Sequence, residues 1–191
     1  MLSIPGITAA QAATYYERLD DYYAKQLPGQ WFGKGAESLG ITGGVNREEF
    51  INLLHGRSPD GDELIQTASN GEHRAGLDLT FSAPKSISIL NIFREEFREA
   101  HLKAVISTLD YVQKNFIQAR ETHDGVTEKV NTGNLVAALY EHTLSRQEDP
   151  QLHTHAVIMN ATERNDGQWR AITNESLFDN KMLIGQVYRN E

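Results

Sequence analysis

The sequence predicts one mixed domain in which helices pack against antiparallel β-strands. Residues 76–81 alternate apolar and polar side chains, as a half-buried strand does, whereas residues 95–120 repeat apolar side chains at helical spacing. The chain has 191 residues, 39% of them hydrophobic, which is enough for one core. Because no repeat, low-complexity tract or linker divides it, we expect residues 1–191 to form a single domain.

The first third of the chain is expected to hold two helices separated by a loop. Thr8 is the expected N-cap of the first helix, in which apolar positions follow a helical period. Residues 28–44 are rich in glycine and aromatic side chains, which indicates a loop. A second helix begins at Asn46, with Glu49 in the position of a capping box, and ends at Gly56.

The rest of the chain combines strands with helices. The predicted strands are, in order, residues 76–81, 135–143, 153–161 and 169–172. The last three follow one another closely, so we expect an antiparallel meander. Pro84 marks the start of a helix, and residues 95–120 form the main packing helix. The final segment begins with a cap at Thr173 or Asn174 and is predicted to continue as one amphipathic helix to the last residue.

Composition excludes several classes of protein. The absence of cysteine excludes a disulfide-stapled scaffold, a thiolate zinc site and a cysteine nucleophile, and it favours a reducing cytoplasm. The N-terminus does not resemble a secretion signal, and no apolar run approaches the roughly 20 residues that span a bilayer, so we expect a soluble protein. A formal charge of −8 alone disfavours a nucleic-acid partner, although an enzyme that holds a metal ion brings positive charge of its own to a phosphate.

Three histidines are predicted to converge on one face of a hairpin. His153 and His155 are two residues apart on a strand, so their imidazoles point the same way. A hairpin that folds about residues 147–148 places His142 opposite His153 and Tyr140 opposite His155. Opposite residues have Cβ atoms about 5 Å apart and diagonal ones about 7 Å apart, so the three imidazoles can reach one ion.

The donor set indicates which metal chemistry is available. Imidazole ligands without thiolates suit Zn²⁺, Mn²⁺, Ni²⁺ or Co²⁺ more than Mg²⁺ or Ca²⁺. Three protein ligands leave coordination positions open, as in catalytic sites. The alternative is that these histidines are ordinary half-exposed strand residues. The other four histidines, His55, His73, His101 and His123, have no partner at ligand spacing and are expected to be structural or surface residues.

Four of the 7 tyrosines form two doublets near the N-terminus, Tyr15–Tyr16 and Tyr22–Tyr23. Aromatic residues at helical spacing are commonly core residues, but the polar, acidic spacer between the doublets indicates a partly wet face. A phenol has a pKa of about 10, so it needs a base or a cation before it can act as a nucleophile. Asp78 faces away from the apolar stripe of its strand and could accept the tyrosine proton or orient an imidazole; alternatively, it faces solvent.

The sequence resembles a known family of DNA-processing enzymes. The runs YYERLDDYYAK, WFGKGAESLGITGGV, GLDLTFSAPKS and TGNLVAALYEHTLSRQEDPQLHTHAVIMN are similar to the N-terminal relaxase domain of conjugative relaxases of the MobF (TrwC/TraI-type) class, within the HUH endonuclease superfamily. The resemblance implies an α+β fold with a central, palm-like antiparallel sheet. Helices would cover one face and the metal site the other. It also implies that residues 1–191 lack the C-terminal part of the domain.

The resemblance further implies an activity and roles for individual residues. The enzyme would cut one strand of plasmid DNA at the nic site of an origin of transfer. Tyr15 would attack the scissile phosphate, which gives a 5′-phosphotyrosyl link and a free 3′-hydroxyl, while Tyr22 and Tyr23 would supply the nucleophile of a later transfer with Tyr16 in support. Asp78 would help to deprotonate the tyrosine. The histidines at positions 142, 153 and 155 would hold a divalent ion, Mg²⁺ or Mn²⁺ in function, although Zn²⁺, Ni²⁺ or Co²⁺ could occupy the site.

The expected partners follow from the same resemblance. They are single-stranded DNA at the origin of transfer, other relaxosome proteins and, in a longer parent protein, a C-terminal helicase. The expected location is the bacterial cytoplasm, without a membrane.

The candidate DNA contacts are Arg74, Lys85, Arg146 and Arg170, with Lys34 and Arg164 as further cations and Trp31 and Trp169 as stacking faces. The alternatives are a rolling-circle replication initiator, a transposase-type nuclease of the same superfamily, or an origin-binding module that does not cut.

Overall fold

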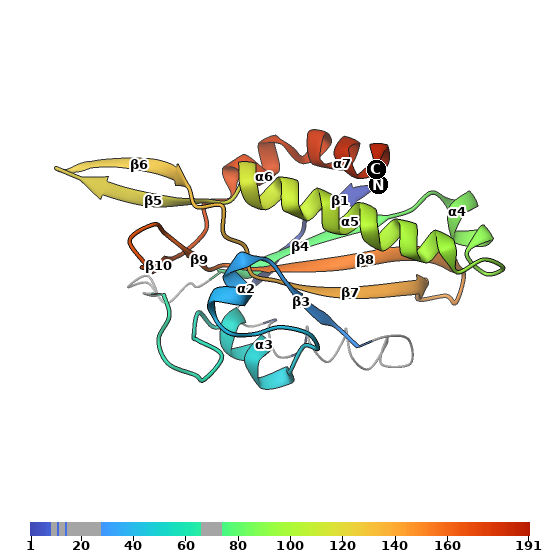
Figure 1. Cartoon of the computed structure of the whole chain (residues 1–191), viewed down its shortest axis with the longest axis horizontal. Coiled ribbons are helices and arrows are strands. Elements are labelled where there is room, and N and C mark those ends of the chain that lie inside the picture. The colour runs from blue at the N-terminus through green and yellow to red at the C-terminus, as the bar shows by residue number, and fades with distance from the viewer. Residues whose placement is uncertain (9–10, 12–13, 15–27, 66–73) are drawn as a thin grey trace.

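The computed structural model describes residues 1–8, 11, 14, 28–65 and 74–191. Most of the predicted N-terminal helix, both tyrosine doublets and His73 lie outside these residues. Its expected N-cap, Thr8, is described and instead ends a short strand at residues 6–8, so that part of the prediction is wrong. Among the described residues, the main feature is a six-stranded antiparallel sheet (Figure 1). Its strands lie in the order β1 (Leu2–Ser3), β4 (Arg74–Ser82), β8 (Pro150–Met159), β7 (Ala137–Leu144) and β3 (Gln30–Phe32), and β2 (Gly6–Thr8) also pairs with β4. The predicted mixture of helices with a central antiparallel sheet is confirmed.

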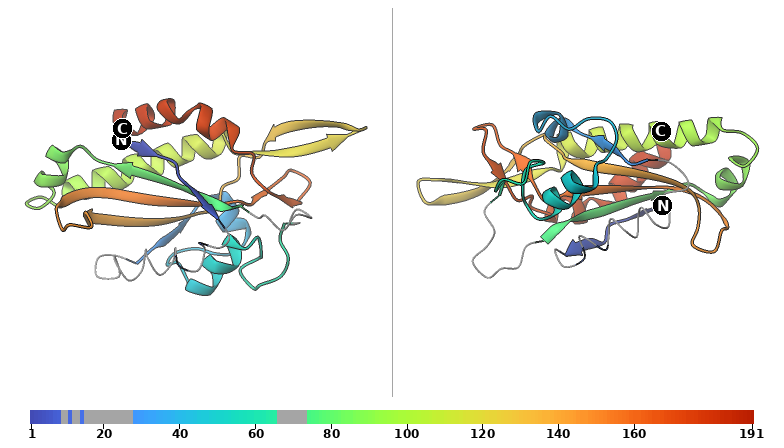
Figure 2. Two further views of the ribbon diagram at one scale, coloured as in Figure 1. Left: turned by 180° about the vertical axis from the view of Figure 1, so that it is seen from behind. Right: turned by 90° about the horizontal axis from the view of Figure 1, so that it is seen from below.

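The long helices cover one face of this sheet. Helix α5 (Glu96–Asn115) and helix α7 (Lys181–Asn190) lie side by side there, as two views of the ribbon show (Figures 1 and 2). The core of this layer joins Leu79 and Phe81 of β4 to Val105 and Leu109 of α5, all of them fully buried. The apolar stripe of β4 thus faces the main packing helix, as its alternation predicted.

A second, smaller core lies on the opposite face. Helix α3 (Arg47–Leu54) packs Phe50, Leu53 and Leu54 against Val157 and Met159 of β8. The predicted helix layer on one face therefore describes α5 and α7, and the short helices α2 (Lys34–Ser38) and α3 add a partial layer on the other. The rest of this second face carries the polar side chains of β4, β7 and β8.

Helix α3 begins where the sequence predicts. The Asn46 side-chain oxygen accepts hydrogen bonds from the backbone N–H groups of Glu48 and Glu49, at 2.8 and 3.4 Å. The return bond of a capping box is not made, because the Glu49 carboxylate accepts from Trp31 Nε1 at 3.0 Å. Gly56 follows the helix with a φ of 74°, a left-handed conformation that glycine adopts without strain.

The environment of β4 differs from the prediction. A half-buried strand was expected, but β4 lies inside the sheet with side chains packed on both faces, and Asp78 is only 3% exposed. The alternative that Asp78 faces solvent is therefore wrong. Helix α4 (Lys85–Leu90) begins directly after Pro84, as expected.

The C-terminal half differs from the predicted elements in three places. Helix α5 ends at Asn115, and the hairpin of β5 (Gln118–His123) and β6 (Val126–Asn131) follows it and projects from the domain (Figure 1). Strands β9 (Thr162–Glu163) and β10 (Trp169–Arg170) form a separate two-stranded sheet instead of extending the meander. The final helix is divided at Asn180 into α6 (Glu175–Asp179) and α7. Within the described parts of the chain, no helix is long and apolar enough to cross a bilayer.

His101 of α5 is a core residue, as the sequence indicated. It is 5% exposed, its Nδ1 lies 2.7 Å from the Tyr188 hydroxyl, and its Nε2 lies 2.8 Å from the Thr154 hydroxyl. Both ring nitrogens thus have a hydrogen-bond partner in the core. Burial, with a smaller contribution from His153 and the N-terminal amine, lowers the pKa of His101 to about 4.

We predict that His101 makes the fold less stable in acid. A histidine of ordinary pKa, near 6.5, takes up its proton in the unfolded chain before His101 does in the folded one. The contribution of His101 to the free energy of unfolding is therefore complete above pH 6.5 and falls by up to about 3 kcal/mol as the pH drops toward 4. Urea unfolding of the parent and of His101→Gln at pH 7 and pH 4.5 measures this, since the difference between the two proteins should narrow in acid. A difference that stays constant would contradict the prediction.

Candidate active site

The β7–β8 hairpin has the predicted register. His142 pairs with His153 and Tyr140 pairs with His155, while on the other side of β8 His155 lies opposite Thr80 of β4. A turn at residues 145–149 closes the hairpin, and Glu148 adopts a positive φ of 62° within it. The register places all three imidazoles on the face opposite α5 and α7.

The three imidazoles form a compact cluster. The ring centroid of His142 lies 5.2 Å from that of His153 and 5.4 Å from that of His155, and the centroids of His153 and His155 are 5.2 Å apart. Rings that bind one ion through nitrogen atoms at about 2.1 Å have centroids about 5 Å apart, so the spacing fits a shared ion. Among the described residues, no three side chains already surround one point at coordination distances. The rings are thus gathered at the right spacing, and rotation about their side-chain bonds is the remaining adjustment.

Hydrogen bonds at Nδ1 orient two of the three rings. His155 Nδ1 donates to Asp78 Oδ2 at 2.7 Å, and the Thr80 hydroxyl donates to Asp78 Oδ1 at 3.2 Å. His153 Nδ1 donates to the backbone carbonyl of Gln151 at 2.8 Å. A donor at Nδ1 places the ring lone pair on Nε2, which is the arrangement found in metal-binding histidines.

The environment keeps the buried rings neutral. Burial, followed by the neighbouring His155 and His153, lowers the pKa of His142 to about 2. Burial also lowers the pKa of His153, against the opposing effect of its bond to Gln151. Because a metal binds the neutral imidazole, these residues do not need to lose a proton at neutral pH to act as ligands. The residues present therefore fit a divalent metal ion.

The candidate DNA contacts are divided between the two ends of the sheet. Lys85 and Arg146 are exposed beside the β7–β8 turn, where Lys85 Nζ donates to the Pro150 carbonyl at 2.9 Å. Arg74 and Arg170 lie at the other end, at the start of β4 and on β10. The structure does not gather the four residues into one patch, but it places a pair beside each end of the strands that carry the histidines.

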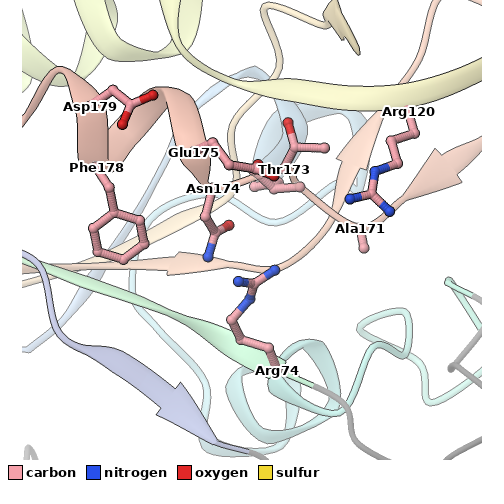
Figure 3. Close-up of a pocket in the computed structure, with 9 residues that line it drawn as sticks. Arg74, Arg120, Ala171, Thr173, Asn174, Glu175, Phe178 and Asp179 are labelled. Atoms are coloured by element: carbon pink, nitrogen blue, oxygen red, sulfur yellow. The ribbon is translucent and has the colours of Figure 1, made fainter. Parts of the chain in front are cut away.

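At the far end, Arg74 and Arg120 point into a cavity of about 630 Å³ between β4, β5 and α6 (Figure 3). Arg74 Nη1 and Nε lie 2.6 and 3.1 Å from the Asn174 carboxamide when its oxygen faces the guanidinium. The sequence analysis missed Arg120, because its approach to Arg74 depends on the β5–β6 hairpin.

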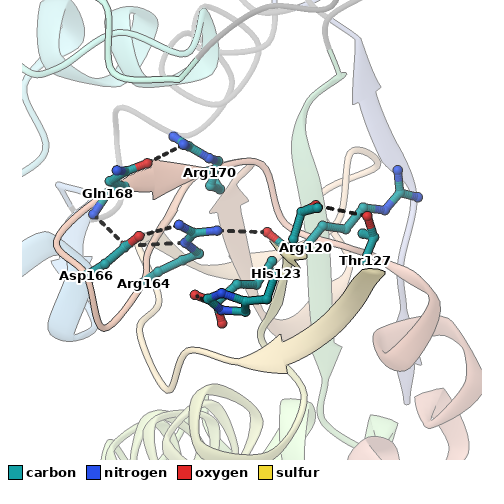
Figure 4. A network of polar contacts seen from close by, with 9 residues as sticks. Arg120, His123, Thr127, Arg164, Asp166, Gln168 and Arg170 are labelled. Carbon is teal, nitrogen blue, oxygen red and sulfur yellow. Dashed lines mark hydrogen bonds and ion pairs between the residues drawn. The ribbon is translucent and has the colours of Figure 1, made fainter. Parts of the chain in front are cut away.

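The β9–β10 loop carries a local network of polar contacts (Figure 4). Arg164 pairs with Asp166 and donates to the Arg120 carbonyl at 3.2 Å, while Arg170 is bound to Gln168. These contacts hold Arg164 against strand β5 of the hairpin, whereas Arg170 bonds only to Trp169 and Gln168 of its own loop among the described residues.

One predicted stacking residue is corrected. Trp31 is 8% exposed and lies in the second core against Phe50, so it offers no surface to a base. Trp169 is partly buried against the same core. Thr80 was missed as a site residue, although it shares the face of Asp78 two residues away and the strand period could have indicated it.

Comparison with known proteins gives one consistent result. The family model described as TrwC relaxase matches residues 9–191. The chain is 41% identical over 206 residues to the multifunctional conjugation protein TraI of Escherichia coli K12, and 41% identical over 198 residues to a second TraI from E. coli. It covers 100% and 96% of its own length in these matches but spans only 12% and 11% of the two relatives.

Solved structures agree with the sequence relatives. The conjugative relaxase TrwC in complex with oriT DNA, in a metal-free structure, matches the whole chain with a TM-score of 0.88 and 41% identity, over 67% of its own chain. A copper-bound structure of TrwC with oriT DNA matches with a TM-score of 0.88 and 44% identity, over 68% of its chain. A TrwC complex with a 27-mer that contains the recognition hairpin and the cleavage site gives 0.87 and 41%, over 66% of its chain.

Proposed function

The chain belongs to the TrwC relaxase family, and from this membership we propose that it nicks one DNA strand at an origin of transfer and later rejoins it, which initiates conjugative transfer. One observation of the structure carries the proposal. It is the cluster of His142, His153 and His155 on one sheet face, with Asp78 bonded to His155 at 2.7 Å. The oriT DNA complexes of TrwC support the substrate class.

The proposed metal ligands are the three clustered histidines. The metal-bound and copper-bound TrwC structures support a divalent ion in this family. A bound divalent ion supplies positive charge to the non-bridging phosphate oxygens and stabilises the charge that develops during displacement at phosphorus. We propose Mg²⁺ or Mn²⁺ in function, and the imidazole donors would also accept Zn²⁺, Ni²⁺ or Co²⁺.

The proposed covalent step is a transesterification. The Tyr15 phenol oxygen attacks phosphorus, the bond from phosphorus to the 3′-oxygen breaks, and the leaving 3′-oxygen takes up a proton to become the 3′-hydroxyl, which balances the proton released by the phenol. The 5′-phosphotyrosyl diester keeps the strand competent for rejoining, with Tyr22 or Tyr23 as the nucleophile of the second transfer and Tyr16 in support. Asp78 is engaged by His155 and Thr80, which supports an orienting role rather than that of proton acceptor.

We also propose the setting of this activity. Residues 1–191 would form one relaxase domain that continues further in the parent protein, since the chain spans 12% of TraI and 67% of the TrwC chain in the solved complex. A C-terminal helicase and other relaxosome proteins would complete the assembly in the bacterial cytoplasm. Arg74, Lys85, Arg146 and Arg170 would contact the DNA.

The decisive experiment tests whether a covalent protein–DNA product forms. The protein is mixed with single-stranded oligonucleotides that span the origin of transfer, with Mg²⁺, Mn²⁺ or EDTA, and an SDS-stable adduct is sought by gel and peptide mass spectrometry. A metal-dependent adduct on Tyr15, absent with a scrambled oligonucleotide, is expected. Binding without any adduct would instead indicate an origin-binding module. An adduct on a tyrosine other than Tyr15, formed with an oligonucleotide from a replication origin, would favour the rolling-circle or transposase alternative.

We predict that Asp78→Asn weakens metal binding by about 10-fold to 100-fold. The amide keeps the shape of the side chain but removes the negative charge that supports the Nδ1–H of His155. Titration calorimetry with Mn²⁺ measures the change, and Asp110→Asn on α5 is the control, because the Asp110 carboxylate accepts a hydrogen bond from Gln113 at 2.8 Å and lies on the other side of the sheet. Equal affinity in Asp78→Asn and the parent would refute the orienting role.

A further inference from the structure

A group of buried polar residues lies directly behind the histidine cluster. Glu141 precedes His142 on β7, and Thr154 stands between His153 and His155 on β8, so both point to the α5 side of the sheet. They are register partners, and Glu141 is 8% and Thr154 0% exposed. The surrounding layer is otherwise apolar, which makes this polar pair costly to bury without partners.

Both partners come from one face of α5. Arg98 Nε lies 3.4 Å from Glu141 Oε1, and His101 Nε2 lies 2.8 Å from the Thr154 hydroxyl. Arg98 and His101 are three residues apart, so they share one helix face and reach β7 and β8 side by side. His101 is itself held at Nδ1 by the Tyr188 hydroxyl of α7, at 2.7 Å.

Apolar packing is incomplete at this point of the layer. A cavity of about 200 Å³ adjoins the polar pairs and is lined by Arg98, Leu102, Glu141 and Thr154, among others. The apolar core continues beside this pocket, since Leu139 of β7 and Ala156 of β8 belong to one buried cluster with Val105 and Leu109 of α5. Beside this pocket, the His101–Thr154 hydrogen bond and the Arg98–Glu141 ion pair are the directional contacts that link the two strands to α5.

We propose that Arg98 and His101 are positioning residues for the histidine cluster. They hold Glu141 and Thr154 in place on the α5 side of the sheet. Because these residues lie next to the histidines on β7 and β8, this fixes the rotation of the two strands about their own axes and, with it, the direction in which the three imidazoles point. Tyr188 sets the orientation of His101 through its hydrogen bond to Nδ1 and is therefore part of the same positioning network. The inference rests on the proposed metal-binding function, and it adds residues on the far face of the sheet to that site.

The test removes one hydroxyl. Thr154→Val keeps the shape and strand preference of threonine but cannot bond His101, and Thr154→Ser restores the hydroxyl. Thr108→Val is the matched control, because Thr108 is also fully buried on α5 and, within the described parts of the chain, its hydroxyl donates to the Ala104 carbonyl of the same helix at 2.7 Å and to no other residue. Mn²⁺ affinity is measured by calorimetry, and stability by thermal unfolding.

Thr154→Val should bind Mn²⁺ about 10-fold more weakly, whereas Thr154→Ser and Thr108→Val should stay within about twofold of the parent. Thr154→Val and Thr108→Val should both lower the unfolding temperature by a few degrees, so stability loss alone cannot explain the affinity difference. Unchanged affinity in Thr154→Val, or an equal loss in Thr108→Val, would overturn the proposal. If Thr154→Val does not fold, Tyr188→Phe takes its place, with an expected loss of about threefold.

A metal-free measurement separates this proposal from the proposed function. The imidazole ¹⁵N–¹H correlations of His153 and His155 should shift in Thr154→Val but not in Thr108→Val. If the parent binds no Mn²⁺, the proposed metal site fails, and these spectra still decide whether His101 positions the two rings. Identical spectra in the parent and Thr154→Val would overturn the positioning role.

Discussion

Replacement of Tyr15 by phenylalanine is expected to abolish the covalent DNA adduct while DNA binding stays within about twofold of the parent. Phenylalanine keeps the aromatic ring but lacks the oxygen that would form the phosphodiester, so no bond to phosphorus can form at this position. The yield of SDS-stable adduct should fall below about 1% of the parent value. Fluorescence anisotropy with the same oligonucleotide measures binding.

Two further variants make this result specific to Tyr15. Tyr111→Phe removes a hydroxyl from a partly buried ring on α5 and should leave both adduct and binding unchanged. Tyr22→Phe should allow the first adduct but impair a second transfer to a new strand. A full yield of adduct from Tyr15→Phe would remove the nucleophile assignment, and loss of binding in the same variant would show that the ring serves recognition.

Sequence patterns predicted the elements whose signals are local. The β7–β8 register followed from a period of two and a short polar turn, which together leave few alternative pairings. The start of α3 followed from Asn46 as an N-cap, and the two faces of β4 from its alternation. For this reason the convergence of His142, His153 and His155 could be predicted before the fold was known.

Features that depend on distant contacts could not be predicted in the same way. Whether Asp78 faces solvent or the site could not be decided from the sequence, because the strand order that places β4 inside the sheet is not encoded in the strand itself. The β5–β6 hairpin is mostly exposed and so lacks an apolar stripe; its one local signal is Asp124–Gly125, a turn pair with positive φ at both residues. The contact between His101 and Thr154 joins residues 53 positions apart, so no local pattern indicates it.

The second large effect is expected at the histidine cluster. His153→Ala should lower the affinity for Mn²⁺ by at least about 10-fold and reduce metal-dependent adduct formation in proportion. His153 is 5% exposed, its ring centroid lies 5.2 Å from both other rings, and its Nδ1 is held by the Gln151 carbonyl. Removal of this ring takes away one of three donors that the hairpin brings together, and among the described residues the nearest candidate substitute on α5, His101, has both ring nitrogens in hydrogen bonds with Tyr188 and Thr154.

His123→Ala is the appropriate control for that experiment. His123 ends β5 with a side chain 79% exposed, outside the main sheet that carries the cluster, so its removal changes the histidine count without touching the site. Calorimetry on both variants then separates a specific ligand from non-specific binding to surface histidines. Equal Mn²⁺ affinity in His153→Ala and His123→Ala would refute the metal site. Weak binding in His153→Ala together with a normal adduct would mean instead that the transesterification proceeds without the ion.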